Sequence, residues 1–118
     1  MKILLVEDHP AVAEVSCNLL REVYGHEVVH VATGKAALEA LAGFCPDMVL
    51  LDVHLPDMTG YDVAVRLRAE PKWESVILVA LTGFGNEVDC ARATAVGIDA
   101  HFRKPMDFEL LSRLKRAA

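Results

Sequence analysis

The sequence has no apolar run that approaches membrane-spanning length, and its first residues carry one lysine and too short an apolar segment for a signal peptide. We therefore expect a cytoplasmic protein that makes no membrane contact. Positive charge is also scarce, with 12 Lys and Arg against 17 Asp and Glu and a formal net charge of −5. This deficit argues against a general binder of nucleic acid or of membrane surfaces.

Cysteine is scarce as well. Cys17, Cys45 and Cys90 form no C-x-x-C pair, and no histidine stands at zinc-finger spacing from them. This argues against a disulfide framework or a zinc finger, so we expect free, reduced thiols. Apolar residues are abundant, at 53% of 118 residues, which is enough for one substantial core. We expect a single domain over residues 1–118.

Five apolar runs alternate with five helical patterns. We expect strands at residues 2–6, 26–32, 48–52, 76–81 and 98–103, and helices at 10–24, 33–42, 61–69, 87–96 and after a cap at Asp107. The first helix has an apolar stripe of Val12, Val15, Leu19 and Val23, and the last has Phe108, Leu111 and Leu114 facing inward. The alternation predicts right-handed βαβ connections and a parallel sheet covered on both faces.

Polar residues stand where these strands end. Asp52 ends a fully apolar run, Glu7 and Asp8 follow the first strand, and Thr82 and Lys104 follow the fourth and fifth. Ligands of open α/β sheets bind at this edge. Three crowded carboxylates repel one another unless a cation intervenes, and Mg²⁺ takes such oxygen ligands. Acids, a cation site, an ammonium and a hydroxyl around one aspartate suit transfer of a phosphoryl group onto it.

The sequence resembles the receiver domains of two-component response regulators over essentially its whole length. The matching segments are Glu7-Asp8, Val49-Leu50-Leu51-Asp52 with Leu55-Pro56-x-Met58-x-Gly60, Leu81-Thr82-Gly83, Gly97-Ile98-Asp99-Ala100 and Lys104-Pro105. The resemblance implies a flavodoxin-like (βα)5 doubly wound sandwich with a five-stranded parallel sheet of order 2-1-3-4-5.

The resemblance also implies a metal site and a phosphoacceptor. Asp52 would accept a phosphoryl group from a phosphohistidine on a sensor histidine kinase or phosphotransfer protein. Asp8, Asp52 and the backbone carbonyl of His54 would hold Mg²⁺, for which Mn²⁺ could substitute, and Glu7 would act directly or through water.

A switch is implied too. Lys104 would pair with the phosphoryl oxygens, Thr82 would move toward the phosphate, and the peptide bond between Lys104 and Pro105 would be cis. His101 would be the second switch residue, since it stands where the family usually has a tyrosine or phenylalanine that turns inward on activation. Phosphorylation would then change the face made by the last two helices and the last strand. A homodimer through that face is one possible outcome. No direct contact with nucleic acid is expected.

Three alternative functions fit the sequence less well. A Mg²⁺-dependent phosphohydrolase would need an acid two residues after Asp52, where His54 stands, and a flavin- or nucleotide-binding module would need a phosphate loop in place of Glu7-Asp8-His9-Pro10. A docking module could keep the fold without phosphorylation control. We expect no metabolic enzyme, only self-phosphorylation and self-dephosphorylation. The sequence does not separate a free-standing regulator from a receiver of a hybrid sensor kinase.

Several residues have a simpler interpretation. Asp57 and Asp99 are interpreted as turn residues, Trp73 as a packing residue, and His30 as a solvated residue of an edge strand.

Overall fold

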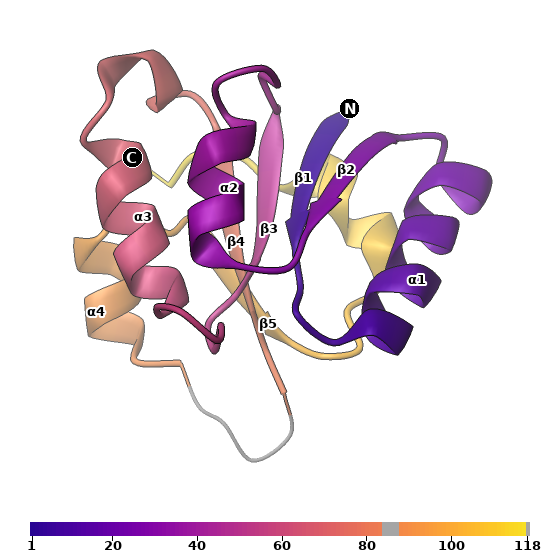
Figure 1. The fold of residues 1–118 in the computed structure, drawn as a ribbon. Helices are drawn as coiled ribbons and strands as arrows, with labels where there is room; N and C mark the ends of the chain where they lie inside the picture. Colours follow the sequence, from indigo (N-terminus) through magenta and orange to yellow (C-terminus); the bar gives the residue numbers. More distant parts are fainter. Residues whose placement is uncertain (84–87, 118) are drawn as a thin grey trace.

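The computed structural model describes residues 1–83 and 88–117. Its strands are β1 Lys2–Val6, β2 Glu27–Val31, β3 Met48–Asp52, β4 Ile77–Thr82 and β5 Ala100–Arg103 (Figure 1). They pair in parallel in the order β2-β1-β3-β4-β5. This confirms the expected flavodoxin-like sheet, with β2 at one edge.

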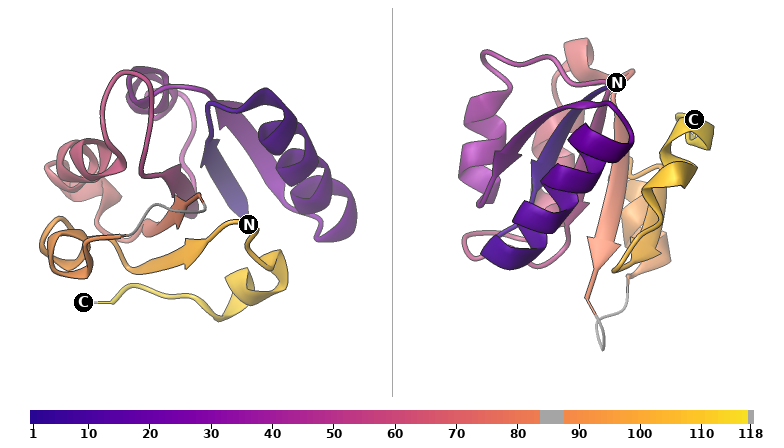
Figure 2. Two further views of the ribbon diagram at one scale, coloured as in Figure 1. Left: turned by 90° about the horizontal axis from the view of Figure 1, so that it is seen from below. Right: turned by 90° about the vertical axis from the view of Figure 1, so that its right-hand side faces the viewer.

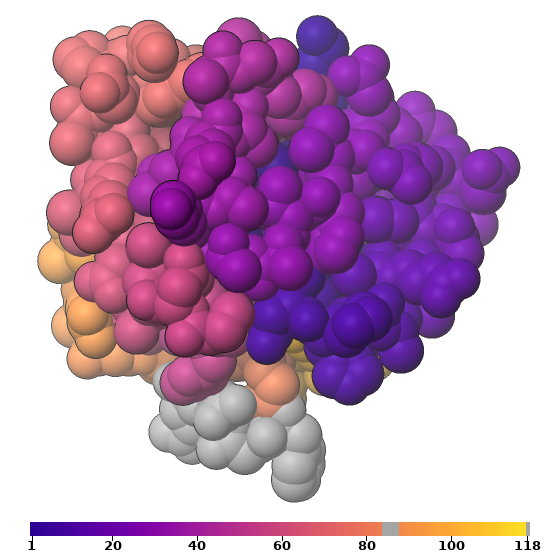
Figure 3. Space-filling view, viewed as in Figure 1, coloured from indigo at the N-terminus to yellow at the C-terminus, as the bar shows by residue number. Residues whose placement is uncertain are grey.

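Helices cover both faces of the sheet. One face carries α1 Pro10–Asn18, its π-helical continuation η1 Leu19–Val23 and the 3₁₀ helix η3 Phe108–Arg113; the other carries α2 Gly34–Ala40, α3 Gly60–Arg68 and α4 Cys90–Ala95 (Figure 2). The 3₁₀ turn η2 Pro71–Trp73 leads into β4. In Figure 3 the side chains of α2 and α3 lie side by side in front of the sheet. Within residues 1–83 and 88–117, no helix is long and apolar enough to cross a membrane.

The central strand β3 shows why the sheet needs cover on both sides. All five of its residues are buried. Val49 and Leu51 belong to the core beneath α2, α3 and α4, whereas Met48 and Leu50 belong to the core beneath α1 and η3. Successive side chains of a strand point to opposite faces, so a continuous apolar run can fill both cores.

The apolar stripe of the first helix does not face the core. Val12, Val15, Leu19 and Val23 are 37%, 59%, 39% and 63% exposed, and the sheet is instead covered by Ala13, Cys17 and Leu20. The helix thus has two apolar sides, and the side that carries Ala13, Cys17 and Leu20 is the buried one. The spacing identified an apolar side but could not say which side packs.

The final helix is not the expected α-helix. After the cap at Asp107, which accepts a hydrogen bond from Glu109 N at 3.0 Å, the chain forms the 3₁₀ helix η3 and becomes extended at Leu114. Phe108 and Leu111 are buried and Leu114 is half-buried. Their spacing of three residues matches the 3₁₀ repeat as well as an α-helical stripe.

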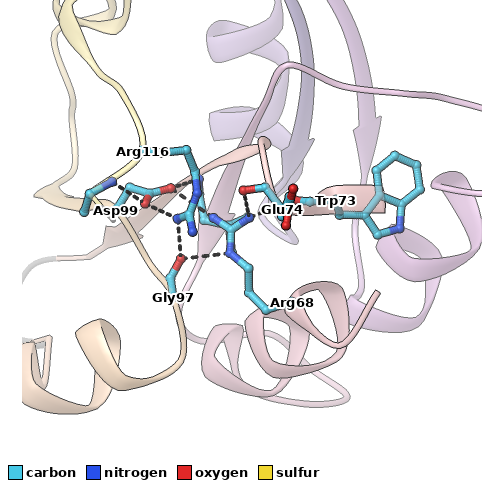
Figure 4. Close-up of polar contacts among 8 residues, drawn as sticks. Arg68, Trp73, Glu74, Gly97, Asp99 and Arg116 are labelled. Atoms are coloured by element: carbon cyan, nitrogen blue, oxygen red, sulfur yellow. Dashed lines mark hydrogen bonds and ion pairs between the residues drawn. The ribbon is translucent and has the colours of Figure 1, made fainter. Parts of the chain in front are cut away.

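The turn before β5 holds a buried carboxylate that joins three segments. Asp99 accepts hydrogen bonds from Leu78 N at 2.9 Å, Arg68 Nη2 at 3.0 Å, Ala117 N at 2.8 Å and the Arg116 guanidinium (Figure 4). Its side chain is 1% exposed. These contacts tie residues 116–117 to the turn before β5, so Asp99 has a larger structural role than the expected turn residue.

Arg68 is held mainly by backbone oxygens. It donates to Trp73 O at 2.8 Å and Gly97 O at 3.1 Å in addition to its ion pair with Asp99. Burial, together with the charge of Arg116, lowers the pKa of the Arg68 guanidinium, although Asp99 opposes this. Trp73 is buried, in agreement with a packing role.

Helix α4 begins later than expected. Residue 87 lies outside the described residues, while Val88 and Asp89 are not helical and the Asp89 carboxylate caps the helix by accepting from Arg92 N at 3.0 Å. The Tyr61 hydroxyl of α3 accepts from Asp89 N at 2.9 Å. A cap and a neighbouring side chain therefore fix the start of α4 at Cys90.

Candidate metal site at the carboxyl edge of the sheet

The five polar residues expected at the strand ends lie at one edge of the sheet. Asp52 ends β3 and Thr82 ends β4, while Glu7 and Asp8 follow β1, and Lys104 follows β5. Strands β1 and β3 are neighbours, so the acids at their carboxyl ends meet. The strand order of the sheet reverses between these two strands, which is where ligands bind in open α/β sheets. The topology thus places these polar residues together.

The three acids form a compact cluster. One carboxylate oxygen from each of Glu7, Asp8 and Asp52 lies within 4.8 Å of the other two. Glu7 and Asp52 are only 3% and 6% exposed, whereas Asp8 is exposed. Oxygen donors of this kind, buried on one side and open to water on the other, fit a hard divalent cation that retains part of its hydration.

Lys104 bridges two of these acids. Its Nζ donates to Asp52 Oδ2 at 2.7 Å and to Glu7 Oε1. Burial of the ammonium would lower its pKa, but the hydrogen bonds and charges of Asp52 and Glu7 outweigh burial and raise the pKa of Lys104 above its ordinary value. The ammonium is therefore a fixed positive charge beside Asp52.

Backbone groups orient both buried carboxylates. His54 N donates to Asp52 Oδ1 at 2.9 Å, and His9 N donates to Glu7 Oε2 at 3.1 Å. The His30 ring, although it lies on edge strand β2, hydrogen-bonds to Glu7 O through Nε2 at 2.7 Å. Since a carbonyl only accepts, Nε2 is the donor. The sequence missed this contact, because it depends on the parallel pairing of β1 with β2.

Asp57 holds the loop that follows β3. Its two carboxylate oxygens accept from Lys35 N and Gly34 N of the first turn of α2, each at 2.9 Å. These hydrogen bonds, that from Lys35 first, lower the pKa of the Asp57 carboxyl. The residue was expected to bond within its own turn, but it caps a helix 22 residues earlier in the chain.

Thr82 and His101, the two expected switch residues, lie in different places. Thr82 is 3% exposed, its carbonyl accepts from Lys104 N at 2.7 Å, and the peptide bond from Lys104 to Pro105 is cis. His101 is exposed and lies opposite Ala80 in the sheet, outside the acidic cluster. The structure therefore places Thr82 at the edge with Lys104, and His101 on the outer strand.

An apolar groove lies beside the acidic cluster. Its volume is about 460 Å³, and Glu7 and Lys104 belong to its lining. The other lining residues come chiefly from α1 and from the segment after β5, and include Val12, Val15, Leu19, Pro105, Met106 and Phe108. The exposed stripe of α1 thus forms one wall of a groove that reaches the acids and the lysine.

Known proteins share both the sequence pattern and the fold. Residues 3–115 match the family model described as the response regulator receiver domain. The transcriptional regulatory protein TcrA of Mycobacterium tuberculosis is 37% identical over 116 residues, covering 98% of this chain and 45% of that protein. The chain thus spans less than half the length of this relative.

Solved structures are similar over nearly the whole chain. A putative response regulator from Chloroflexus aurantiacus is 31% identical with a TM-score of 0.83, covering 95% of this chain and 92% of that one. The receiver domain of sensor histidine kinase PA1611 from Pseudomonas aeruginosa is 31% identical with a TM-score of 0.81, covering 95% and 91%, and contains a magnesium ion in its active site cleft.

Proposed function

Since the chain belongs to the family of response regulator receiver domains, we propose that it is a phosphorylation-controlled switch of a two-component phosphorelay, with Asp52 as the phosphoacceptor. One observation carries the proposal: Lys104 hydrogen-bonds to Asp52 and Glu7, within the cluster that Asp8 completes. This arrangement offers a nucleophilic carboxylate, a fixed cation for the incoming phosphoryl oxygens, and a metal site on the solvent side.

Magnesium is the proposed cofactor. Asp8, Asp52 and the backbone carbonyl of His54 would hold the ion, with Glu7 as a direct or water-mediated ligand, and Mn²⁺ would substitute. When bound, the ion would neutralise the acids and polarise the phosphoryl group. Its presence in the related receiver domain of PA1611 supports this assignment.

The residues of this chain would divide the transfer step among them. An Asp52 carboxylate oxygen attacks phosphorus, and the bond from phosphorus to the donor's imidazole nitrogen breaks. Lys104 stays charged and neutralises the phosphoryl oxygens, while His54 N continues to orient Asp52. Thr82 supplies a hydroxyl from the neighbouring strand end. The only chemistry at this site would be phosphorylation and dephosphorylation of Asp52 itself.

The donor would be a sensor histidine kinase or a phosphotransfer protein that covers the groove beside α1. Val15 and Leu19 are large exposed apolar residues on the wall of that groove, which opens beside Lys104. A partner that buries them would bring its phosphohistidine to the same edge of the sheet. Exposed apolar patches of this kind are typical of protein interfaces.

The output surface would lie at the β5 edge of the sheet. Helix α4 and strand β5, with η3 in place of a last α-helix, would change when Thr82 moves, and would accept a partner or a second copy of the chain. The backbone hydrogen bond from Lys104 N to Thr82 O already joins β4 to the end of β5. A shift at Thr82 can therefore reach the outer strand.

The test is the mass of the intact protein after incubation with Mg²⁺ and acetyl phosphate, beside Asp52→Asn and a chelated sample. We expect one phosphoryl group, labile to base and absent from both controls. A chain that stays unmodified, and also takes no phosphate from phosphorylated kinases, would be a docking module that keeps the fold without the switch.

A further inference from the structure

A thiol and an imidazole meet on the surface between α4 and β5. Cys90 is the first residue of α4, His101 lies on β5, and Cys90 Sγ is 3.6 Å from His101 Nε2. Both side chains are exposed. Neither belongs to the acidic cluster or to the groove beside α1. The pair therefore has no part in the proposed transfer to Asp52.

The contact gives the thiol a base. A thiol reacts as a thiolate, and an imidazole nitrogen within hydrogen-bond reach can take the proton as the sulfur attacks. Cys90 Sγ also lies 3.8 Å from Val88 O, which can hold the proton only as a hydrogen-bond acceptor. His101 Nε2 is thus the group that can remove it.

The two other cysteines differ in ways that serve as controls. Cys17 is buried against the sheet, and burial raises the pKa of its thiol. Cys45 is exposed, but within residues 1–83 and 88–117 its thiol makes no hydrogen bond to a histidine. One chain therefore contains a shielded thiol, an exposed thiol, and an exposed thiol beside an imidazole.

We propose that Cys90, with His101 as its base, is a site of modification by small-molecule disulfides. The Cys90 thiol transfers its proton to His101 Nε2 as its sulfur attacks one sulfur of the disulfide. The S–S bond of the reagent breaks, a new S–S bond forms to Cys90, and the other half leaves as a thiolate that takes the proton back from His101. Cys90 is oxidised and the reagent is reduced, with no net uptake of protons.

The adduct would act on the output face. It replaces the contact between Cys90 and His101 with a bulkier group, and so separates the start of α4 from β5. Elsewhere, helix α4 is held by the buried side chain of Ala93, by the hydrogen bond from Asp89 N to the Tyr61 hydroxyl, and by the contact of Arg92 with the Tyr61 ring. Modification would loosen α4 without phosphate on Asp52, which gives this face a second, redox-dependent input.

The experiment uses bis(2-hydroxyethyl) disulfide, an uncharged reagent, on the whole chain, with the rate at each cysteine followed by peptide mass mapping. We expect Cys90 to react about tenfold faster than Cys45, because general-base assistance commonly exceeds that factor. His101→Gln should bring the Cys90 rate down to that of Cys45 while leaving the Cys45 rate unchanged, and continued protection of the buried Cys17 would report that the variant is folded. Equal rates at Cys90 and Cys45 in the natural chain would overturn the proposal that His101 activates Cys90. A Cys90 rate that is the same in His101→Gln as in the natural chain would overturn it too.

Amide hydrogen exchange of the Cys90 adduct tests the consequence. Residues 91–95 should exchange faster in the adduct than in the free protein, while residues of α3 exchange as before. Unchanged exchange in α4 would overturn the proposed effect on the output face. That result would not bear on the proposal that Asp52 is phosphorylated.

Discussion

At Lys104 one ammonium group lies between two buried carboxylates. Lys104→Met removes its hydrogen bonds to Asp52 and Glu7 and leaves the acids facing each other. We expect the free energy of unfolding in metal-free buffer to fall by about 1.5–3 kcal/mol, the range for hydrogen bonds to charged groups. Urea denaturation measures it, with Lys115→Met at an exposed position as the matched control.

The pH dependence of that loss follows from the raised pKa of Lys104. Its contribution to stability is complete below the ordinary lysine pKa of about 10.4 and disappears as the pH rises through the higher folded-state pKa. The difference between the natural chain and Lys104→Met should therefore persist at neutral pH. A loss no larger than that of Lys115→Met would show that the ammonium does not stabilise the acids.

The stability that Asp57 contributes has the opposite pH dependence to that of Lys104. Its folded-state pKa is lowered by the hydrogen bonds from Lys35 N and Gly34 N. The stability that it adds is present above its ordinary pKa of about 3.9 and is lost as the pH falls through the lower folded-state pKa. We expect Asp57→Ala to lower the melting temperature at pH 7, and this difference to vanish in strong acid. Glu39→Ala, on the exposed side of α2, should show neither effect.

Among the elements, α1 carries the clearest interaction surface. Val15→Asp places a charge on the exposed wall of the groove without touching the acidic cluster. Because acetyl phosphate needs no protein docking, we expect its reaction with Asp52 to be unchanged, while transfer from a phosphorylated histidine protein slows at least about tenfold, a cost of roughly 1.4 kcal/mol in docking.

Val65→Asp is the matched control for that experiment. Val65 is 53% exposed, but it lies on α3, which covers the other face of the sheet. Its substitution should leave transfer from the histidine protein intact. Equal slowing by both variants would point to a general effect of added negative charge and would contradict the assignment of the donor surface to α1.

Helix α4 depends on one aromatic residue of its neighbour. The Tyr61 hydroxyl accepts from Asp89 N, and the Arg92 guanidinium lies 4.3 Å from the centre of the Tyr61 ring. Tyr61→Phe keeps the ring and loses the hydroxyl, so we expect a loss of about 1 kcal/mol, with faster amide exchange in α4. Tyr24→Phe, at an exposed position, is the control. Exchange that rises equally in α3 would indicate general destabilisation instead.

For the whole molecule, the sequence predicted the alternation of strands and helices and the edge of the sheet where the polar residues lie. Apolar runs and strand-end residues were enough to bring Asp52 and Asp8 to one edge of the sheet, because parallel strands carry their carboxyl ends there. The strand order that makes them neighbours was implied by the resemblance to receiver domains. The sequence did not predict that Asp57 caps α2, that Asp99 binds Arg116, or that the stripe containing Val15 faces outward. Each of these depends on contacts between segments far apart in the chain, which spacing alone does not reveal.

Metal binding at the acidic cluster would also stabilise the entire fold. A ligand that binds only the folded chain stabilises it by RT ln(1 + [L]/Kd), so Mg²⁺ at ten times its Kd should add about 1.4 kcal/mol to the free energy of unfolding. Asp8→Asn removes one charged ligand from the cluster of Glu7, Asp8 and Asp52. We expect it to raise stability in metal-free buffer, because like charges no longer repel, and to abolish most of the gain from Mg²⁺. Thermal unfolding with and without the ion measures both effects, with Asp107→Asn, outside the cluster, as the control. A gain from Mg²⁺ as large in Asp8→Asn as in the natural chain would place the ion elsewhere on the protein.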